Sequence, residues 1–419
     1  MMVKKSFDVV VIGAGIVGVS SALWLQREGL SVALVDRKEP GQGTSFGNAG
    51  VFADYAFYAL NDPALPKKIP NKLFGKDHPV GMRYPYVLGM IPWFLQFLMN
   101  CRPKQADHIA HAIEYLCRHA KDGISPLLED AKAFDLIDKR GAIELYNNKV
   151  DFDGSTKKTD ILQKKQYRTR TIMPADLADL EPNFKLPFYK GVFYEDAWSL
   201  LNPGPMVGRL ADHFKSAGGV FAQMDVERIS KRPEGGVMLI CGSTHIKAKQ
   251  VVLAAGAFSC QIKGSGAERL PLETERGYHV MFDDAKDLIS RPVGWTDMGV
   301  FVSPINGGIR AAGTVEFGGL SDVKSKARLE HIEKCVKRML PDLKNMKRTS
   351  DWVGHRPTLP DSLPVIGRTR EMPDVILAFG HQHLGMTLGG ITGKLVSEIA
   401  TNKPMTMDIS AYSPDRFGV

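Results

Sequence analysis

Three glycines near the N-terminus carry the clearest chemical signal in the chain. Gly13, Gly15 and Gly18 form the pattern GxGxxG directly after the apolar run 8–12. Glycine at these positions permits a tight turn, lets the backbone approach a pyrophosphate, and lets the following helix pack closely on the strand. The N–H groups at the start of that helix then face the phosphates. The sequence therefore predicts a dinucleotide-binding turn with contacts from Gly13, Ala14, Gly15, Ile16, Val17 and Gly18.

An acidic residue follows this turn at a suitable distance. Asp36 ends a second apolar run, 32–35, and its carboxylate is suited to accept hydrogen bonds from ribose hydroxyls. We expect the neighbouring Arg37 to contribute to the same site. A strand, a glycine turn, a helix, a strand and a terminal acid in this order predict a βαβ unit. NAD and FAD both use such a unit.

Two glycine-rich segments favour FAD over NAD. Residues 41–50 (GQGTSFGNAG) carry small and hydroxyl-bearing side chains that suit phosphate or the flavin edge. Near the C-terminus, the apolar run 375–379 leads through several glycines into a predicted helix that ends near Ala400. The dipole of such a helix stabilises negative charge on a reduced flavin. The predicted contacts are Thr44, Ser45, Asn48, Ala49, Gly50, Gly380, His383, Leu384, Gly385, Met386 and Thr387.

A further buried strand is predicted between these segments. The run 251–256 is apolar and β-branched, and it ends in Ala255 and Gly256. It would complete a dinucleotide domain that the chain order interrupts. We expect Ala255, Gly256 and the upstream Val226 to contact the cofactor.

Six motifs in this order carry a family resemblance: GAGIVG, TSFGNAG, ERGYHVMF, GIRAAGTVEFGG, GHRPTLPDSLPVIG and GHQHLGMTLGGITG. The chain resembles the D-amino acid oxidase superfamily, in particular its bacterial D-amino acid dehydrogenase and hydroxyproline dehydrogenase branch. The resemblance implies an α/β fold with a Rossmann-like FAD-binding domain built from discontinuous segments, 1–55, 200–268 and 345–419. It also implies an α+β substrate domain with a large, mostly antiparallel sheet, formed by 56–199 and 269–344.

The resemblance also implies a substrate site. Arg356, in the G-x-R-P motif, corresponds to the arginine that clamps the substrate carboxylate, and a guanidinium suits that bidentate contact. His383 is a candidate for binding the carboxylate or adjusting the amine, and Tyr278 is a weaker candidate. The alternatives are an arginine before a surface turn, a histidine that caps a turn, and a core tyrosine.

The reaction implied is FAD-dependent dehydrogenation of a small amino acid by hydride transfer from the α-carbon to flavin N5. The product is an imino acid, and then a keto acid or a cyclic imine. The candidate substrates are a D-amino acid and D-hydroxyproline or a proline-like compound. FAD is expected to be noncovalent, because the chain lacks the cysteine that tethers flavin in sarcosine-oxidase relatives. The expected electron acceptor is a quinone or another respiratory-chain component.

Three alternatives remain at this stage. The first is an oxygen-using amino-acid or sarcosine-type oxidase that produces hydrogen peroxide. The second is a non-catalytic FAD-binding subunit of an amine-oxidising complex. The third is an NAD-linked dehydrogenase, which the second glycine-rich turn disfavours.

Composition limits the remaining classes. The 419 residues suit two to three domains, and the net charge of +8 is spread without a basic block, which argues against nucleic-acid binding. Five scattered cysteines without CxxC predict neither a disulfide framework nor a metal site.

The N-terminus does not resemble a signal peptide, so we expect a cytoplasmic protein. The apolar stretch 84–99 is too short to span a bilayer. It predicts a buried helix after Pro92, with a peripheral contact on the inner face of the membrane as the alternative.

Overall fold

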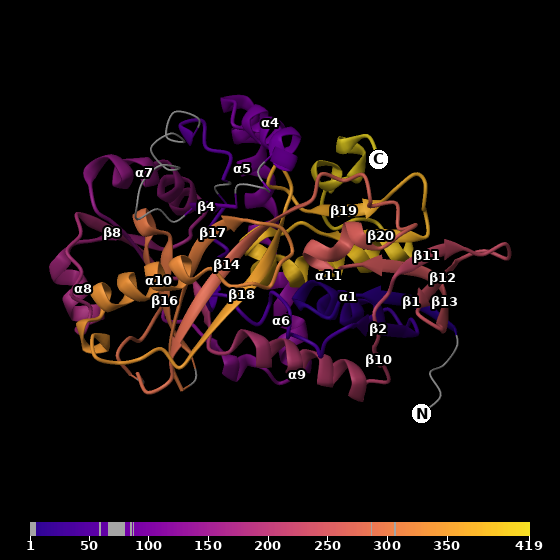
Figure 1. The fold of residues 1–419 in the computed structure, drawn as a ribbon, viewed down its shortest axis with the longest axis horizontal. Helices are drawn as coiled ribbons and strands as arrows, with labels where there is room; N and C mark the ends of the chain where they lie inside the picture. Colours follow the sequence, from indigo (N-terminus) through magenta and orange to yellow (C-terminus); the bar gives the residue numbers. More distant parts are fainter. Residues whose placement is uncertain are drawn as a thin grey trace.

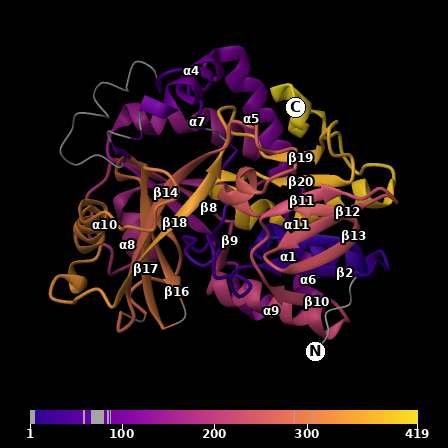
Figure 2. The same ribbon diagram turned by 45° about the vertical axis from the view of Figure 1, so that its right-hand side comes forward.

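The computed structural model describes residues 6–57, 60–65, 80–83, 86, 88–285, 287–305 and 307–419. These residues form two large sheets and one small sheet (Figure 1). Figure 2 shows the two large sheets as the two halves of the molecule, with helix α10 (Lys326–Met339) at the outer side of one half. Each half draws on segments that lie far apart in the sequence.

The first sheet contains five parallel strands, which the chain reaches in three separate passes. Strands β10 (Val220–Gln223), β2 (Val32–Asp36), β1 (Ser6–Ile12), β13 (Thr244–Leu253) and β20 (Val375–Phe379) lie side by side in this order. Antiparallel strands β12 (Val237–Cys241), β11 (Arg228–Lys231) and β19 (Val365–Arg368) extend it. The central strands are almost wholly apolar because both of their faces are covered.

Helices α1 (Ile16–Arg27) and α11 (Gly385–Thr401) pack against each other beside this sheet. Glycine makes their close approach possible. A Cβ atom at Gly393 would lie 2.6 Å from the backbone carbon of Ser20, and one at Gly389 would lie 2.8 Å from Ile16 Cγ1. The two helices that follow the glycine-rich turns are therefore held in a fixed relation.

The second sheet is mostly antiparallel. Its long strand β14 (Glu273–Phe282) lies between β17 (Gly308–Phe317) and β18 (Ser350–Thr358). The sheet continues through β16 (Val300–Ile305), β15 (Val293–Trp295), β6 (Ala142–Tyr146), β8 (Lys190–Tyr194) and β7 (Thr169–Ile172), and β4 (Val80–Met82) pairs with β17. The apolar face of α10 covers β14 and β17.

One strand crosses the predicted division of the chain. Residues 350–358, which form β18, fall in the predicted cofactor segment 345–419 but pair with β14 in the second sheet. Arg356 is therefore carried by the mostly antiparallel sheet. The remaining domain boundaries stay a prediction.

The remaining strands and α-helices pack around the two large sheets. They are the short strands β3 (Val51–Phe52), β5 (Ile137–Asp138) and β9 (Trp198–Leu200), and the helices α4 (Ile91–Asn100), α5 (Pro103–Arg118), α6 (Ala120–Asp130), α7 (Lys149–Lys164), α8 (Pro174–Leu180) and α9 (Pro203–Ser216).

Helix α4 confirms only in part the prediction of a buried helix after Pro92. It has that proline in its first turn, and Trp93 and Phe97 are buried on its inner face. Its outer face is open: Leu95 is 56% exposed and Ile91 is 51% exposed. None of the helices formed by the described residues is long and apolar enough to cross a bilayer.

Candidate active site

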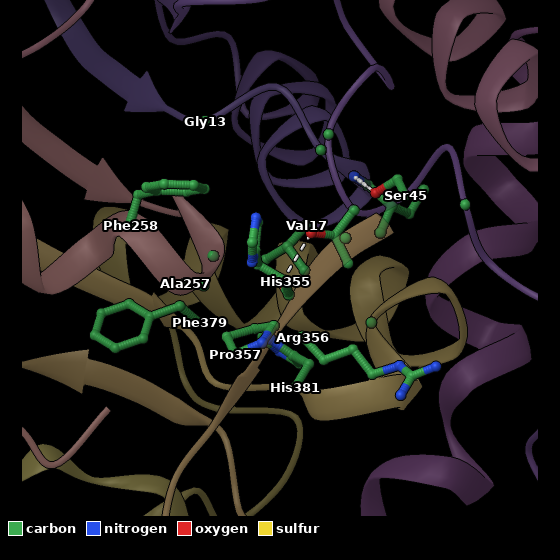
Figure 3. A pocket seen from close by; sticks show the side chains of 18 of the residues that line it. Gly13, Val17, Ser45, Ala257, Phe258, His355, Arg356, Pro357, Phe379 and His381 are labelled. Atoms are coloured by element: carbon green, nitrogen blue, oxygen red, sulfur yellow. Dashed lines mark hydrogen bonds between the residues drawn. The ribbon is translucent and has the colours of Figure 1, made fainter. Parts of the chain in front are cut away.

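A cavity of about 960 Å³ runs from the first sheet to the second. It begins at the carboxyl ends of β1, β2 and β13, which is where open parallel sheets bind their ligands. It ends against the face formed by β14, β17 and β18. Figure 3 shows Phe258 and the Arg356 guanidinium at opposite sides of this space.

The predicted glycine turn forms the first part of the wall. Gly13 has φ +105°, and a Cβ atom there would lie 2.3 Å from the carbonyl oxygen of Ala254. A Cβ at Gly18 would lie 1.7 Å from the carbonyl oxygen of Gly13. Neither position therefore accepts a side chain without movement of the backbone. Gly15 lies at the start of α1, whose first N–H groups adjoin the cavity.

Asp36 lies in the wall at the end of β2, as predicted. Its carboxylate accepts hydrogen bonds from the backbone N–H groups of Ala14, at 2.7 Å, and Lys38, at 2.8 Å. The acid therefore braces the glycine turn as well as facing the cavity. Arg37 stacks on the Phe258 ring, with its guanidinium carbon 3.8 Å from the ring centre. Phe258 was not among the predicted residues, because only the fold brings it beside Arg37.

The loop 41–50 is fixed to the rest of the wall by hydrogen bonds. Ser45 Oγ accepts from the N–H of Ile16 at 3.1 Å, and Thr44 Oγ1 donates to the carbonyl of His355 at 2.8 Å (Figure 3). Buried Arg310 donates to the carbonyls of Phe46 and Asn48, each at 2.8 Å. The loop therefore connects the glycine turn with the second sheet.

The C-terminal glycine segment contributes a buried donor. Gly380 has φ +91° and turns the chain from β20 toward α11. Gln382, also at positive φ (+50°), lines the cavity, and its Nε2 is buried without a hydrogen-bond partner. Buried amide donors are almost always satisfied in folded proteins, so this group is available to a ligand.

Most of the predicted cofactor contacts do meet at the cavity. The residues in its wall are Gly13, Gly15, Ile16, Val17, Asp36, Arg37, Thr44, Ser45, Asn48, Ala49, Val226, Ala255, Gly256, His383, Gly385 and Met386. The others do not line the cavity, namely Ala14, Gly18, Gly50, Gly380, Leu384 and Thr387. Of these, Thr387 accepts a hydrogen bond from the N–H of Ala53.

Arg356 enters the opposite end of the cavity from β18. Its Nη1 donates to the carbonyl of Thr314 at 2.9 Å, and it forms no ion pair with any described residue. Burial lowers the pKa of Arg356 below its ordinary value. A Cβ atom at Gly277 would lie 2.3 Å from Arg356 Nη2, so the glycine in the motif ERGY makes room for the guanidinium.

His383 also faces this end of the cavity. Its side chain is exposed to the open cavity. Partial removal from water by the surrounding protein, together with the positive charge of Arg356, lowers the pKa of His383 to about 4. The imidazole is therefore neutral at neutral pH. It can accept or donate one hydrogen bond there without adding charge.

Tyr278 does not lie in the cavity wall. Its hydroxyl donates to Glu316 at 2.6 Å, and Glu316 also pairs with Arg276. Successive side chains of a strand point to opposite faces, so Glu275 and Gly277 face the cavity while Tyr278 packs in the core beneath α10. The structure corrects the prediction of a catalytic Tyr278.

Glu275 and Thr314 are further polar residues of the wall that were not predicted, in addition to Gln382. Glu275 is 2% exposed, and its Oε1 has no hydrogen-bond partner. Thr314 has φ +59°, and its buried hydroxyl is also without a partner. Both lie in strands whose pairing partners are distant in sequence.

Comparison with known proteins agrees with this architecture. The family model described as DAO, FAD dependent oxidoreductase, matches residues 8–399. A curated D-amino-acid oxidase from Bradyrhizobium diazoefficiens is 32% identical over 416 residues, which cover 98% of each chain.

Solved structures show the same fold at low sequence identity. Glycine oxidase from Geobacillus kaustophilus superposes with a TM-score of 0.78 at 18% identity, over 98% of each chain. L-proline dehydrogenase from P. horikoshii also gives 0.78 at 18% identity, over 99% of each chain. The predicted fold class is thereby confirmed.

Proposed function

Because the chain belongs to the DAO family of FAD-dependent oxidoreductases, we propose that its cavity binds a small amino acid and promotes removal of hydride from the α-carbon. The protein is an FAD-using oxidoreductase that acts on amino-acid C–N donors. As the substrate we propose a D-amino acid, or D-hydroxyproline or a related proline-like compound.

The described residues fit FAD. The glycine turn leaves no space for side chains at Gly13 and Gly18, and the cavity contains an unpartnered buried donor at Gln382. In our proposal, the turn holds the pyrophosphate, Asp36 a ribose, and Gln382 a polar edge of the flavin. Bound FAD supplies the acceptor for a hydride. None of the five cysteines, all of them described, lines the cavity, which supports noncovalent binding.

The Arg356 guanidinium, which forms no ion pair with any described residue, is the observation that carries the substrate assignment. An arginine that is half-buried in the cavity wall, with one backbone carbonyl as its hydrogen-bond partner among the described residues, retains several unused donors. A carboxylate satisfies two of them at once. Gly277 and the Thr314 carbonyl fix the side chain in place. Arg356 thereby holds the α-carbon of the substrate at one position in the cavity. Neutral His383 provides a further hydrogen bond near the same substrate groups.

The product follows from the bond that is broken. Loss of hydride from the α-carbon and of a proton from nitrogen leaves a C=N bond. A primary amine gives an imino acid, which water converts to a keto acid, whereas a proline-like substrate gives a cyclic imine.

We propose that the enzyme is a dehydrogenase whose electron acceptor is a quinone or another respiratory-chain component. The exposed apolar face of α4 supports a peripheral contact with the inner face of the membrane, where such acceptors dissolve. An oxidase that reduces oxygen directly is the alternative. A non-catalytic FAD-binding subunit is disfavoured by the free Arg356 side chain in the cavity.

Anaerobic mixing tests this function. The purified protein is mixed with D-amino acids, hydroxyproline isomers, proline and sarcosine, and the flavin band near ~450 nm is followed. We expect one substrate class to bleach the band. The bleached protein should then reduce a quinone analogue faster than oxygen. A yellow protein that no amine bleaches would contradict the proposal.

A further inference from the structure

Glu275 differs from the other buried glutamates around the second sheet. The residue is 2% exposed, and among the described residues Oε1 has no hydrogen-bond partner and the carboxylate forms no ion pair. Three other buried glutamates have a cationic partner: Glu144 with Lys158 at 2.9 Å, Glu181 with Arg291 at 2.9 Å, and Glu316 with Arg276 at 2.5 Å. An unpaired carboxylate costs several kcal/mol to bury, so a binding partner is expected for it.

The pairing of β14 with β18 places Glu275 beside Arg356. The two residues are directly opposite each other in the antiparallel register, and both line the cavity. Arg356 nevertheless donates to the Thr314 carbonyl and forms no ion pair with Glu275. A cation and an anion thus stand next to each other in one cavity, each with unused hydrogen-bonding capacity.

A local irregularity of β17 lies beside this pair of residues. The register of β14 and β17 shifts between Arg276 and Tyr278, and on the opposing strand Thr314 adopts φ +59°. This conformation is uncommon for a β-branched residue, and strained backbone often occurs at functional sites. Here it accompanies the hydrogen bond from Arg356 to the Thr314 carbonyl.

An amino acid has charges that match this arrangement. Its carboxylate and its ammonium group are attached to the same carbon. When Arg356 binds the carboxylate, the ammonium group therefore lies close by. Building on the proposed function, we propose that Glu275 is the catalytic residue that binds the substrate's amino group and accepts the proton which that group loses before hydride transfer. In this step an N–H bond breaks and an O–H bond forms on the carboxylate, while no electrons are transferred.

The electrostatics of the site agree with this role. Burial raises the pKa of Glu275 above its ordinary value, and Arg356 and Thr358 oppose part of that effect. A carboxylate with a raised pKa is a better proton acceptor than an exposed one. The amine left after proton loss has the lone pair that forms the C=N bond.

Glu275→Gln tests the inference, because it keeps the shape of the side chain and removes the charge. We expect the rate of flavin bleaching at pH 7 to fall roughly 100-fold or more, as for loss of a general base. The rate should recover about tenfold per pH unit toward the amine's own pKa, because solution then supplies the free amine. The titratable groups nearest Glu275 are Arg356 opposite it on β18, His383 in the same cavity wall, and Glu273 two positions away on β14, and the substitution leaves all three in place.

A second readout separates proton transfer from structural damage. Aliphatic monocarboxylates such as propionate need Arg356 but have no amine. We expect Glu275→Gln to bind propionate at least as tightly as the wild type does, while it binds the amino acid more weakly. Glu275→Asp should restore part of the bleaching rate. Glu181→Gln is the matched control, since Glu181 is buried and paired outside the cavity, and it should change neither readout.

Each outcome has a distinct meaning. If wild-type protein bleaches with an amino acid and Glu275→Gln bleaches at the same rate, this inference is wrong while the proposed function stands. If no amino acid bleaches the wild type, both fall. If Glu275→Gln does not retain FAD, the wild-type protein still provides a test. The inference is wrong if the wild type binds an amino acid no more tightly than it binds the corresponding carboxylic acid without the amino group.

Discussion

At the residue scale, the substrate end of the cavity contains polar groups whose partners are incomplete. Arg356 has one backbone carbonyl as its hydrogen-bond partner, while Glu275 Oε1 and the hydroxyl of Thr314 have none. Folded proteins seldom leave such groups unsatisfied, because each costs free energy when water is excluded. The set is best explained by a ligand that carries both a carboxylate and an amine.

Arg356→Ala is the direct test of carboxylate binding. We expect kcat/KM for the amino acid to fall by roughly 10²–10³-fold, because a charge-assisted bidentate contact contributes several kcal/mol. Stopped-flow bleaching of the flavin measures the effect. FAD content should be unchanged, since the arginine lies at the far end of the cavity from the glycine turn. Arg356→Lys should lose less than the alanine variant, and equal rates for all three proteins would show that Arg356 does not bind substrate.

At the element scale, the site depends on how closely two helices can approach each other. Helices α1 and α11 both begin at the cavity and meet through glycines of α11. Their crossing fixes the relation between the N-terminal glycine turn and the segment that contains Gln382 and His383. Packing between elements is therefore as important to the cofactor site as the motifs themselves.

Gly393→Ala tests this packing. A methyl group there would lie 2.6 Å from the backbone of Ser20, so we expect a loss of roughly 1–3 kcal/mol in unfolding free energy and weaker FAD binding. Gly208→Ala, in the middle of α9, is a matched control because nothing lies within 4 Å of its Cβ position. That change should stabilise by about 1 kcal/mol through helix propensity. Denaturant melts of the two variants should move in opposite directions, and equal shifts would contradict the argument.

The outer face of α4 supports the membrane prediction. Leu88 is 73% exposed, and Ile91, Leu95 and Met99 continue the same apolar stripe. No acidic residue occurs between positions 88 and 106, and exposed Arg102 and Lys104 follow the helix. An amphipathic surface of this kind suits an anionic bilayer.

Co-sedimentation with vesicles containing phosphatidylglycerol measures this contact. Replacing both Leu88 and Leu95 by Ser should weaken binding by tenfold or more, because each leucine contributes roughly 1.5–3 kcal/mol when buried. Val150→Ser combined with Val323→Ser removes two equally exposed apolar side chains elsewhere and should leave binding unchanged. Equal sedimentation of both double variants would instead indicate that α4 does not contact the bilayer.

At the scale of the whole molecule, local patterns predicted the cofactor half better than the substrate half. The glycine turn and Asp36 lie within one short βαβ unit, so their spacing alone indicates their role. The pairing of β14 with β17 and β18 brings Glu275 and Thr314 to the cavity. The order of the strands along the chain does not reveal the register of that pairing. Tyr278 was wrongly predicted because the sequence left open which face of β14 meets the cavity.

The buried histidines should also make the stability of the whole fold depend on pH. Burial lowers the pKa of His381 to about 3, and burial together with the charge of Arg310 does the same for His279. The unfolded chain therefore binds more protons than the folded chain between about pH 6.5 and pH 3. Stability is fully present above pH 6.5 and falls with decreasing pH across that window.

Thermal and denaturant melts between pH 7 and pH 4.5 test this linkage. Each of the two histidines should contribute a slope of about 1.4 kcal/mol per pH unit once the pH lies well below 6.5. His381→Gln retains a hydrogen-bonding group for Thr392 and should reduce the slope by about that amount. His279→Gln should produce a similar reduction, and the two effects should add, because the two imidazoles have different hydrogen-bond partners, Gly47 and Thr392. Variants with the wild-type slope would show that these imidazoles become protonated without unfolding, and hence that water reaches them in the folded protein.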